Sequence, residues 1–409
     1  MPIKVECSEC NKTYRVSEEA AGKKFRCKSC GAAISVPSTD DVVEYADEDD
    51  EVEEYDEPPA RRRPSKSRKS KSRSKGGVNP LLWVGLAGGG GLLVICVLVL
   101  MIAGGGSSRQ PAPSGTSVPQ VPLTSIAPPT FPELGNPRVV LQPSGVRMWF
   151  VQMHGAGPGQ TMAMRVYLPP VDAPNQSIPC VLVAPAGTNL LVGNDMDADD
   201  YHDETLPYVL AGMAVIFYSL DGGVPNMENA SDAQFAAGYK KFKAAQAGVV
   251  NGRNALDFVL AKIPQVNPKQ IYSAGHSSAG TVSLLLASHE PRLAASIAYA
   301  ACSDVETRLA PVSRTWGITT LLPDLTNFVK ESSPRTHVAK INCPVFLFHA
   351  SDDSNVPVTE SQTYSQLLKS AGKTVELQTV PTGNHYDSMI QQGIPRAIQW
   401  LQTQKPTAP

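Results

Sequence analysis

The sequence predicts a mostly parallel, doubly wound α/β sheet for residues 138–409. Short apolar runs alternate there with longer amphipathic stretches, which is typical of parallel strands covered by helices on both faces. In addition, one apolar run ends in a serine that follows a glycine by two positions, as in a sharp turn from strand to helix. No repeat of about 20–50 residues is present, so nothing indicates a propeller.

The expected elements follow from the apolar runs and from the amphipathic stretches between them. The strands are expected at Met162–Leu168, Cys180–Ala184, Ala214–Tyr218, Ile271–Ala274, Ala294–Tyr299, Val345–Phe348 and Val375–Val380. The helical stretches are Ala233–Ala261, Ser278–Ser288 and Thr359–Ala371. Their alternation along the chain predicts the crossovers of a parallel sheet.

Four segments of different composition precede this domain. The predicted boundaries are 1–37 for a cysteine-containing module, 38–80 for a charged linker, 81–103 for an apolar run and 104–137 for a Pro/Ser/Gly-rich spacer. The linker is acidic over Asp40–Glu57 and basic over Arg61–Lys75, so the net charge of −2 averages two opposed blocks and identifies no partner. Because the linker is poor in apolar residues, we expect it to be disordered.

The apolar run Leu81–Ala103 contains no charged residue and has the length that a membrane-spanning helix needs. A signal peptide would begin nearer the N-terminus, and a buried helix in water would be weakened by Gly88–Gly91. Basic flanks stay on the cytoplasmic side, so Arg61–Lys75 predicts a cytoplasmic N-terminus and an extracytoplasmic C-terminal domain. Nucleic acid could also bind this basic block. Its position beside the membrane instead favours a role in setting the membrane orientation and in contacting anionic lipid, so no nucleic-acid partner is expected.

Four cysteines near the N-terminus have the spacing of a zinc site. They form two Cys-x-x-Cys pairs separated by sixteen residues, namely Cys7, Cys10, Cys27 and Cys30. Each pair supplies two thiolates to a tetrahedral ion, and a module of this size needs the metal in order to fold. Two disulfides are the alternative, but thiols stay reduced on the cytoplasmic side. The stretch CSECNKTYRVSEEAAGKKFRCKSCGAAISVP resembles the zinc ribbons of some bacterial membrane proteins, which implies a structural zinc or a surface for a cytoplasmic protein partner.

The candidate nucleophile is Ser277, within Ser-Ala-Gly275-His-Ser277-Ser-Ala279-Gly280. An apolar strand enters this turn and a helix leaves it, so the serine is expected on a strained turn above the carboxyl edge of the sheet. Residues two positions away must be small because strand and helix pass close together. Gly275 meets this condition, and Ala279 departs from the usual second glycine by one methyl group.

A serine nucleophile needs a histidine base and a carboxylate that orients it, in the chain order serine, acid, histidine. Downstream of Ser277, Asp352 and Asp353 follow one strand and His385 follows the last strand. Carboxyl ends of parallel strands meet at one edge of the sheet, where such sites form. His385 is therefore the predicted base, and the acid is one of the two aspartates.

Residues 138–402 resemble the α/β-hydrolase superfamily, in its prolyl-oligopeptidase-like and dienelactone-hydrolase-like branches. The acid loop there reads like His-Gly-x-x-Asp-x-x-Val-Pro, which corresponds to His349-Ala-Ser-Asp-Asp353-Ser-Asn-Val-Pro357 and implies Asp353 as the acid. The resemblance also implies an oxyanion hole from two backbone N–H groups. One is expected from Ser278 and the other from Gly187 or Thr188, in a loop where relatives carry His-Gly-Gly.

Together these features predict a membrane-anchored serine hydrolase that uses a Ser277–Asp353–His385 triad and no catalytic cofactor. We expect a carboxylic ester as substrate, because no propeller or lid that would select peptides is evident. A prolyl-oligopeptidase-like peptidase acting on peptides is one alternative. A non-catalytic binding or signalling protein with a degenerate hydrolase domain is another, although a complete triad disfavours it.

Overall fold

A computed structural model of the chain describes residues 3–6, 13–16, 24–26, 33–35, 122–196, 201–225 and 227–404. The chain divides into two compact units, Met1–Lys75 and Gly76–Pro409. The first unit contains two antiparallel hairpins, formed by β1 (Ile3–Glu6) with β2 (Thr13–Val16) and by β3 (Lys24–Arg26) with β4 (Ala33–Ser35).

Several sequence predictions fall outside the described residues. They concern the zinc ligands Cys7, Cys10, Cys27 and Cys30, the linker 38–80 and the apolar run 81–103. Among the residues that are described, no helix has the length and apolar character required to cross a bilayer.

The second unit is built on a nine-stranded sheet with the order β13-β12-β11-β10-β8-β9-β7-β6-β5. Every neighbouring pair from β13 to β9 is parallel, and β7, β6 and β5 extend the sheet antiparallel at one edge. The sheet is therefore mostly parallel, as the sequence predicts. The strands are β5 (Val139–Leu141), β6 (Val146–Gln152), β7 (Ala163–Leu168), β8 (Ile178–Val183), β9 (Ala214–Tyr218), β10 (Val266–His276), β11 (Ala295–Tyr299), β12 (Val345–Ala350) and β13 (Val375–Val380).

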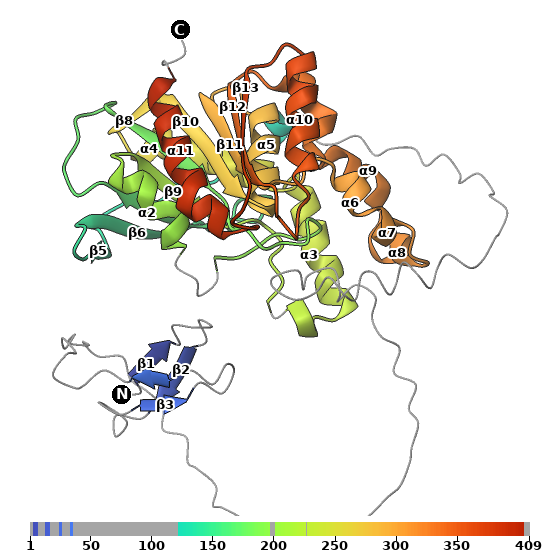
Figure 1. Cartoon of the computed structure of the whole chain (residues 1–409), viewed down its shortest axis with the longest axis horizontal. Coiled ribbons are helices and arrows are strands. Elements are labelled where there is room, and N and C mark those ends of the chain that lie inside the picture. Colours follow the sequence, from blue (N-terminus) through green and yellow to red (C-terminus); the bar gives the residue numbers. More distant parts are fainter. Residues whose placement is uncertain are drawn as a thin grey trace, which may run out of the picture. The chain divides into compact units, whose positions relative to one another are not determined.

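Helices cover both faces of this sheet (Figure 1). They are α2 (His202–Leu210), α3 (Asp232–Ala244), α4 (Val249–Lys262), α5 (Ser278–His289), α6 (Val305–Arg308), α7 (Ala310–Ser313), α8 (Ile318–Leu321), α9 (Leu325–Glu331), α10 (Thr359–Ser370) and α11 (Ile394–Thr403). One apolar cluster joins the sheet to α2 and α11, and a second joins it to α3, α4, α5, α9 and α10. Two separate cores on opposite faces are what a doubly wound sheet requires.

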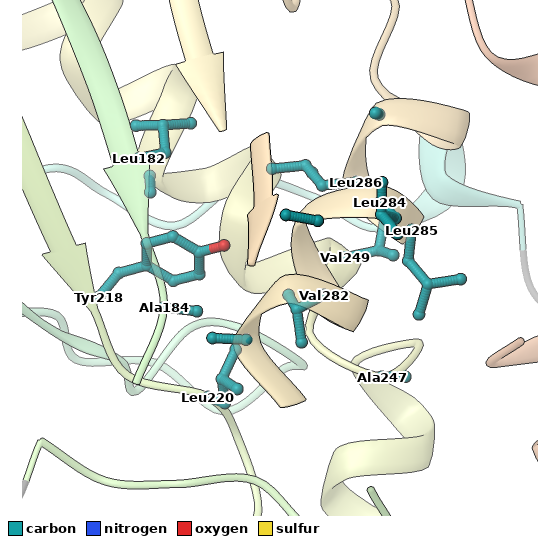
Figure 2. Close-up of a cluster of buried hydrophobic side chains, with 14 of the residues drawn as sticks. Leu182, Ala184, Tyr218, Leu220, Ala247, Val249, Val282, Leu284, Leu285 and Leu286 are labelled. Atoms are coloured by element: carbon teal, nitrogen blue, oxygen red, sulfur yellow. The ribbon is translucent and has the colours of Figure 1, made fainter. Parts of the chain in front are cut away.

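The second core holds the helix that follows the candidate nucleophile. Leu284, Leu285 and Leu286 of α5 are buried in one cluster with Val282, Leu182 of β8 and Tyr218 of β9 (Figure 2). Ser278–Ser288 of α5 are all buried, so this helix lies inside the protein rather than on its surface. Burying each leucine stabilises the fold by about 1.5–3 kcal/mol, and this packing fixes the position of the turn that precedes α5.

Two features differ from the sequence predictions. The stretch Ala233–Ala261 forms two helices, because the chain turns at Gln246, Ala247 and Gly248, which all have positive φ. The strands β5 and β6 were not expected from the pattern, since β6 interrupts its alternation with consecutive buried residues.

Residues 122–137, from the segment expected to be a spacer, pack on helix α4 of the same unit. The ring of Phe131 meets that of Phe258 on α4 at a centroid distance of 5.9 Å. Arg253, also on α4, donates hydrogen bonds to the carbonyls of Leu123 and Ile126. Residues that precede the first strand of the sheet in the chain therefore contribute contacts to α4.

Candidate active site

Ser277 lies at a strained turn between β10 and α5. Its φ of 53° and ψ of −121° place a non-glycine residue in a conformation that L-residues rarely adopt. The Ser277 N–H donates to the carbonyl of Tyr299 at 2.8 Å, and the Ser277 carbonyl accepts the N–H of Thr281 at 3.1 Å. The turn is thus fixed on both sides, by β11 and by the first turn of α5.

Gly275 is required for this turn because strand and helix approach closely. A Cβ at position 275 would lie 2.3 Å from the Ala279 carbonyl oxygen and 2.8 Å from the Gly280 nitrogen. At position 279, by contrast, the alanine methyl group is fully buried in the second core, which contains α5. The sharp turn tolerates alanine at this position but has no room for a side chain at position 275.

Asp353 and His385 come together from two loops that follow neighbouring parallel strands. Asp353 follows β12, His385 follows β13, and the Nδ1 atom of His385 lies 2.7 Å from the Oδ2 atom of Asp353. The Asp353 side chain is fully buried, and that of His385 is 17% exposed. The Nε2 atom of His385 is buried and has no hydrogen-bond partner among the described residues, so it is available to a group in the site.

The carboxylate of Asp353 is held in its charged form. Burial by itself raises the pKa of Asp353, but hydrogen bonds from His349 and His385 outweigh this effect and leave its pKa well below the usual range. The other carboxylate oxygen accepts the N–H groups of Asn355 and Val356 at 2.8 and 2.9 Å. An acid with this set of partners orients a histidine and stays ionised while it does so.

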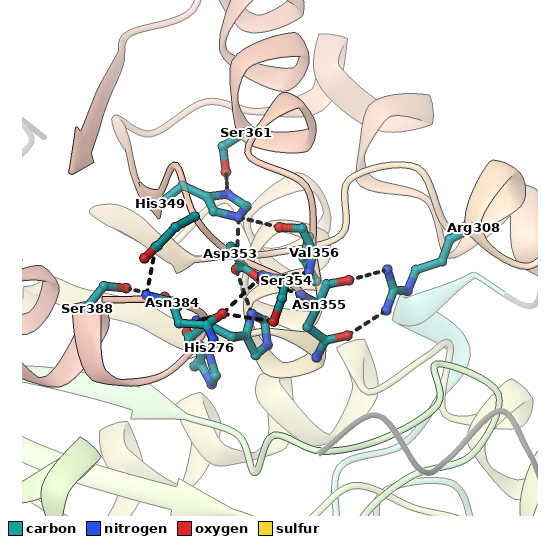
Figure 3. Close-up of polar contacts among 12 residues, drawn as sticks. His276, Arg308, His349, Asp353, Ser354, Asn355, Val356, Ser361, Asn384 and Ser388 are labelled. Atoms are coloured by element: carbon teal, nitrogen blue, oxygen red, sulfur yellow. Dashed lines mark hydrogen bonds and ion pairs between the residues drawn. The ribbon is translucent and has the colours of Figure 1, made fainter. Parts of the chain in front are cut away.

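His349 is a second imidazole in contact with Asp353 (Figure 3). Its Nε2 atom lies 2.8 Å from the Val356 carbonyl and 3.1 Å from Asp353 Oδ2. A carbonyl can only accept, so Nε2 carries a proton, and Nδ1 pairs with the Ser361 hydroxyl at 2.8 Å. His349 is completely buried and has a structural place at the end of β12, as its position in the sequence suggests.

The histidine loop is tied to the acid loop by further hydrogen bonds. The exposed Asp352 carboxylate accepts the N–H groups of Gly383 and Asn384. In return, the Asn384 side-chain oxygen accepts from the N–H and hydroxyl of Ser354 and from the N–H of His385. Asp352 therefore shapes the loop that carries His385, whereas Asp353 contacts the imidazole itself.

His276, the residue before Ser277, links the turn to the histidine loop. Its Nε2–H donates to the His385 carbonyl at 2.8 Å, and the two imidazole rings lie 4.5 Å apart. Burial, together with the neighbouring His385, lowers the pKa of His276 to about 3. His276 is thus a neutral donor at neutral pH.

On the other side of Ser277, the loop after β8 contacts Ser278. The N–H of Thr188 donates to the Ser278 hydroxyl at 3.1 Å, and Ser278 begins α5, where backbone N–H groups lack helical partners. Gly187 is exposed and has a φ of +85°, which accounts for glycine at this position. The two loops predicted to complete the site therefore bond to the residues directly before and after Ser277.

A small cavity lies beneath the turn. Glu204 of α2, Tyr208, His276 and Tyr299 are among its lining residues. The two tyrosine hydroxyls lie 2.5 Å apart. Glu204 is buried, and this burial, with the nearby Asp203, raises its pKa to about 7.

The contacts of His276 and the raised pKa of Glu204 were not predicted from the sequence. The position of His276 beside Ser277 is a signal that could have marked it as a contact of the base loop. Glu204 lies in an acidic stretch of the sequence, and no pattern there distinguishes a buried carboxylate from a solvent-exposed one.

A family model matches the part of the chain that contains the site. Residues 235–404 match the model of the prolyl oligopeptidase family, and this range contains Ser277, Asp353 and His385. No curated protein matches the sequence. The strand order, the turn at Ser277 and the chain order of the three residues describe an α/β-hydrolase fold.

Solved structures similar to this chain include peptidases and esterases. A puromycin-hydrolysing peptidase of Mycobacterium tuberculosis is 17% identical with a TM-score of 0.49, over 66% of this chain and 41% of that one. An acetyl xylan esterase from Paenibacillus sp. R4 is 14% identical with a TM-score of 0.45, over 66% of this chain and 96% of that one. An esterase from Thermogutta terrifontis is 16% identical with a TM-score of 0.44, over 61% of this chain and 91% of that one. The chain spans about four-tenths of the length of the peptidases that it matches, 41% and 42% in two cases.

Proposed function

We propose that the chain is a serine hydrolase that cleaves carboxylic esters through an acyl-enzyme. The observation that carries this proposal is the pair formed by Asp353 and His385 at 2.7 Å, in which the Nε2 atom of His385 has no partner among the described residues. The imidazole lies 4.5 Å from that of His276, the residue directly before the strained Ser277. The family match over residues 235–404 supports the same reaction class.

In the proposed reaction, the Ser277 Oγ atom attacks the ester carbonyl while the His385 Nε2 atom takes the hydroxyl proton. Asp353 stabilises the resulting imidazolium through Nδ1–H. The carbonyl oxygen becomes an oxyanion, which backbone N–H groups including that of Ser278 stabilise. His385 then returns the proton to the leaving alkoxide, which leaves as the alcohol. In the second half of the reaction water attacks the acyl-enzyme, His385 takes its proton and returns it to the Ser277 Oγ atom, and the carboxylic acid is released.

Labelling and turnover test this proposal. A fluorophosphonate probe should label the wild-type protein and leave Ser277→Ala unlabelled. Butyrate and acetate esters of p-nitrophenol should be hydrolysed by the wild type, with loss of about 10³-fold or more in kcat for Ser277→Ala. A wild type that is neither labelled nor active, beside an active control hydrolase, would support the non-catalytic binding alternative instead.

The match to the prolyl oligopeptidase family favours a second candidate, a serine peptidase. The reaction is the same except that an amine leaves in place of an alcohol. Incubation with X-Pro peptides beside the esters separates the two. Turnover of the peptides alone would establish the peptidase and reject the esterase.

We further propose that residues 81–103 anchor the enzyme in the cytoplasmic membrane with the hydrolase domain outside. The support is the uncharged apolar run together with the basic block Arg61–Lys75. Reporter fusions to the C-terminus should be active outside the cytoplasm and silent inside, and the opposite pattern would reject this topology.

The four N-terminal cysteines are proposed to hold a structural zinc ion. Each Cys-x-x-Cys pair falls in the connection between the two strands of a hairpin, with Cys7 directly after β1 and Cys27 directly after β3. When bound, zinc would hold the two hairpins together through four thiolates. The purified protein should contain one zinc per chain, and a variant with Cys7 and Cys10 replaced by serine should lose it.

A further inference from the structure

The loop after β8 offers two backbone N–H groups as candidates for the second oxyanion donor, and the structure distinguishes them. The N–H of Thr188 is already donated to the Ser278 hydroxyl at 3.1 Å. The N–H of Gly187 takes part in no hydrogen bond among the described residues, and Gly187 is exposed. Only the Gly187 N–H is therefore available to a substrate oxygen.

The direction of the Gly187 N–H is set by Asn194. The Nδ2 atom of Asn194 donates to the carbonyl of Ala186 at 2.6 Å. In a planar trans peptide, the C=O of one residue and the N–H of the next point in opposite directions. By holding the Ala186 carbonyl, Asn194 turns the Gly187 N–H to the opposite side of that peptide plane.

Asn194 is itself firmly anchored. Its carbonyl accepts the N–H of Leu220 at 2.8 Å, in the segment that follows β9. The preceding Gly193 donates to the Gly222 carbonyl at 3.2 Å, and a Cβ at position 193 would lie 2.1 Å from the Asp221 carbonyl oxygen. This close backbone contact allows little freedom to the residue that holds the Ala186 carbonyl.

We infer that Asn194 is a positioning residue that orients the Gly187 N–H as the second oxyanion donor, with the Ser278 hydroxyl fixing the same loop one residue further on. The inference rests on the proposed serine hydrolase function and deepens it. Two side-chain hydrogen bonds, one to the Ala186 carbonyl and one to the Thr188 N–H, flank the Gly187 peptide. A donor fixed before substrate binds costs no reorganisation during the reaction, which is what oxyanion stabilisation requires.

The test compares Asn194→Ala and Asn194→Asp with the wild type in the full chain. The aspartate has the shape of asparagine but cannot donate, so it separates the hydrogen bond from packing. Asn267→Ala is the matched control, because it also removes an asparagine with two local hydrogen bonds, at the start of β10 away from the turn. The quantities to be measured are kcat and KM for p-nitrophenyl butyrate, the dissociation constant of phenylboronic acid, and Tm.

Both Asn194 variants should lower kcat by about 10- to 100-fold and change KM by less than about threefold, since loss of a whole donor costs about 10²–10³-fold. The boronic acid forms a negatively charged tetrahedral adduct on Ser277, in which a boron-bound hydroxyl occupies the oxyanion position, so its affinity should fall by a similar factor. Asn267→Ala should leave all three quantities unchanged. If Asn194→Ala does not fold, Asn194→Asp and Ser278→Ala provide the same comparison.

Unchanged kcat in the Asn194 variants, a rise in KM alone, or a loss of kcat without loss of boronic acid affinity would each overturn the inference. Its failure differs from failure of the proposed function. In the first case the wild type is active and Ser277→Ala is inactive, but the Asn194 variants behave like the wild type. A wild type that hydrolyses neither esters nor peptides overturns both.

Discussion

The two sides of the turn at Ser277 are built from different chemistry. On the side of β12 and β13, charged and titratable groups meet, and the contacts of Asp353, His385 and His349 set the pKa of the acid. On the side of β8 and β9, the contacts of Ala186, Thr188 and Asn194 are made by backbone groups, a hydroxyl and a neutral amide.

This difference matches what each side has to do in the proposed reaction. The acid–base side changes its charge during catalysis, so its carboxylate must be stabilised by several donors. The other side only receives a negative charge, for which fixed dipoles are sufficient. We therefore expect substitutions on the first side to alter both rate and pH dependence, and those on the second side to alter rate alone.

The largest effect is expected for Asp353→Asn. The amide cannot hold His385 in the tautomer that presents a free Nε2 lone pair, so kcat for p-nitrophenyl butyrate should fall by about 10³- to 10⁴-fold. Asp352→Asn is the matched control, because Asp352 bonds only to backbone N–H groups of the histidine loop. It should lose less than about tenfold. Equal losses in the two variants would contradict the assignment of Asp353 as the acid, because loop contacts alone would then account for both.

An intermediate effect is expected for His276→Phe, which keeps a ring beside His385 but removes the hydrogen bond to its carbonyl. Displacement of the base should lower kcat/KM by about tenfold, since misplacement of about 1 Å can cost up to 10²-fold. His276→Ala should lose at least as much. If His276→Phe has wild-type kcat/KM, the hydrogen bond does not position His385.

His276 also predicts how stability depends on pH. Its pKa is about 3 in the folded protein and 6.5 ordinarily, so between these values the unfolded chain binds more protons and stability falls as the pH falls. The wild type should therefore lose more stability than His276→Phe between pH 7 and pH 4, measured by urea unfolding. Parallel curves for the two proteins would contradict this assignment.

The smallest effect on activity and the opposite pH dependence are expected for Glu204→Gln. The pKa of Glu204 is raised from 4.5 to about 7, so between these values the folded protein binds more protons and this residue's contribution to stability is lost as the pH rises. The loss is on the order of 3 kcal/mol. The glutamine variant should lack this decline, with kcat at pH 8 within about twofold of the wild type. A decline that persists in Glu204→Gln would show that another group causes it.

The predictable part of the fold and site depends on local patterns. β9 and β13 have the bounds that their apolar runs predict, and Ser277 is recognisable from the small residues that a strand-to-helix turn needs. β6 and the break between α3 and α4 are harder to predict from the sequence. The burial of β6 depends on its neighbours β5 and β7, and the break requires three consecutive residues with positive φ.

The sequence by itself determined the alternation of strands and helices, the chain order of Ser277, Asp353 and His385, and the spacing of the four N-terminal cysteines. Each of these is set by residues that are near one another in the chain or by a short motif. Only the tertiary structure decided which hydrogen bonds join the loops of the site. His276 donates to the His385 carbonyl, the Thr188 N–H donates to the Ser278 hydroxyl, and Asn194 donates to the Ala186 carbonyl. The physical reason is that backbone groups of distant loops carry no sequence signal, and parallel strands bring them to one edge only when the whole sheet has formed.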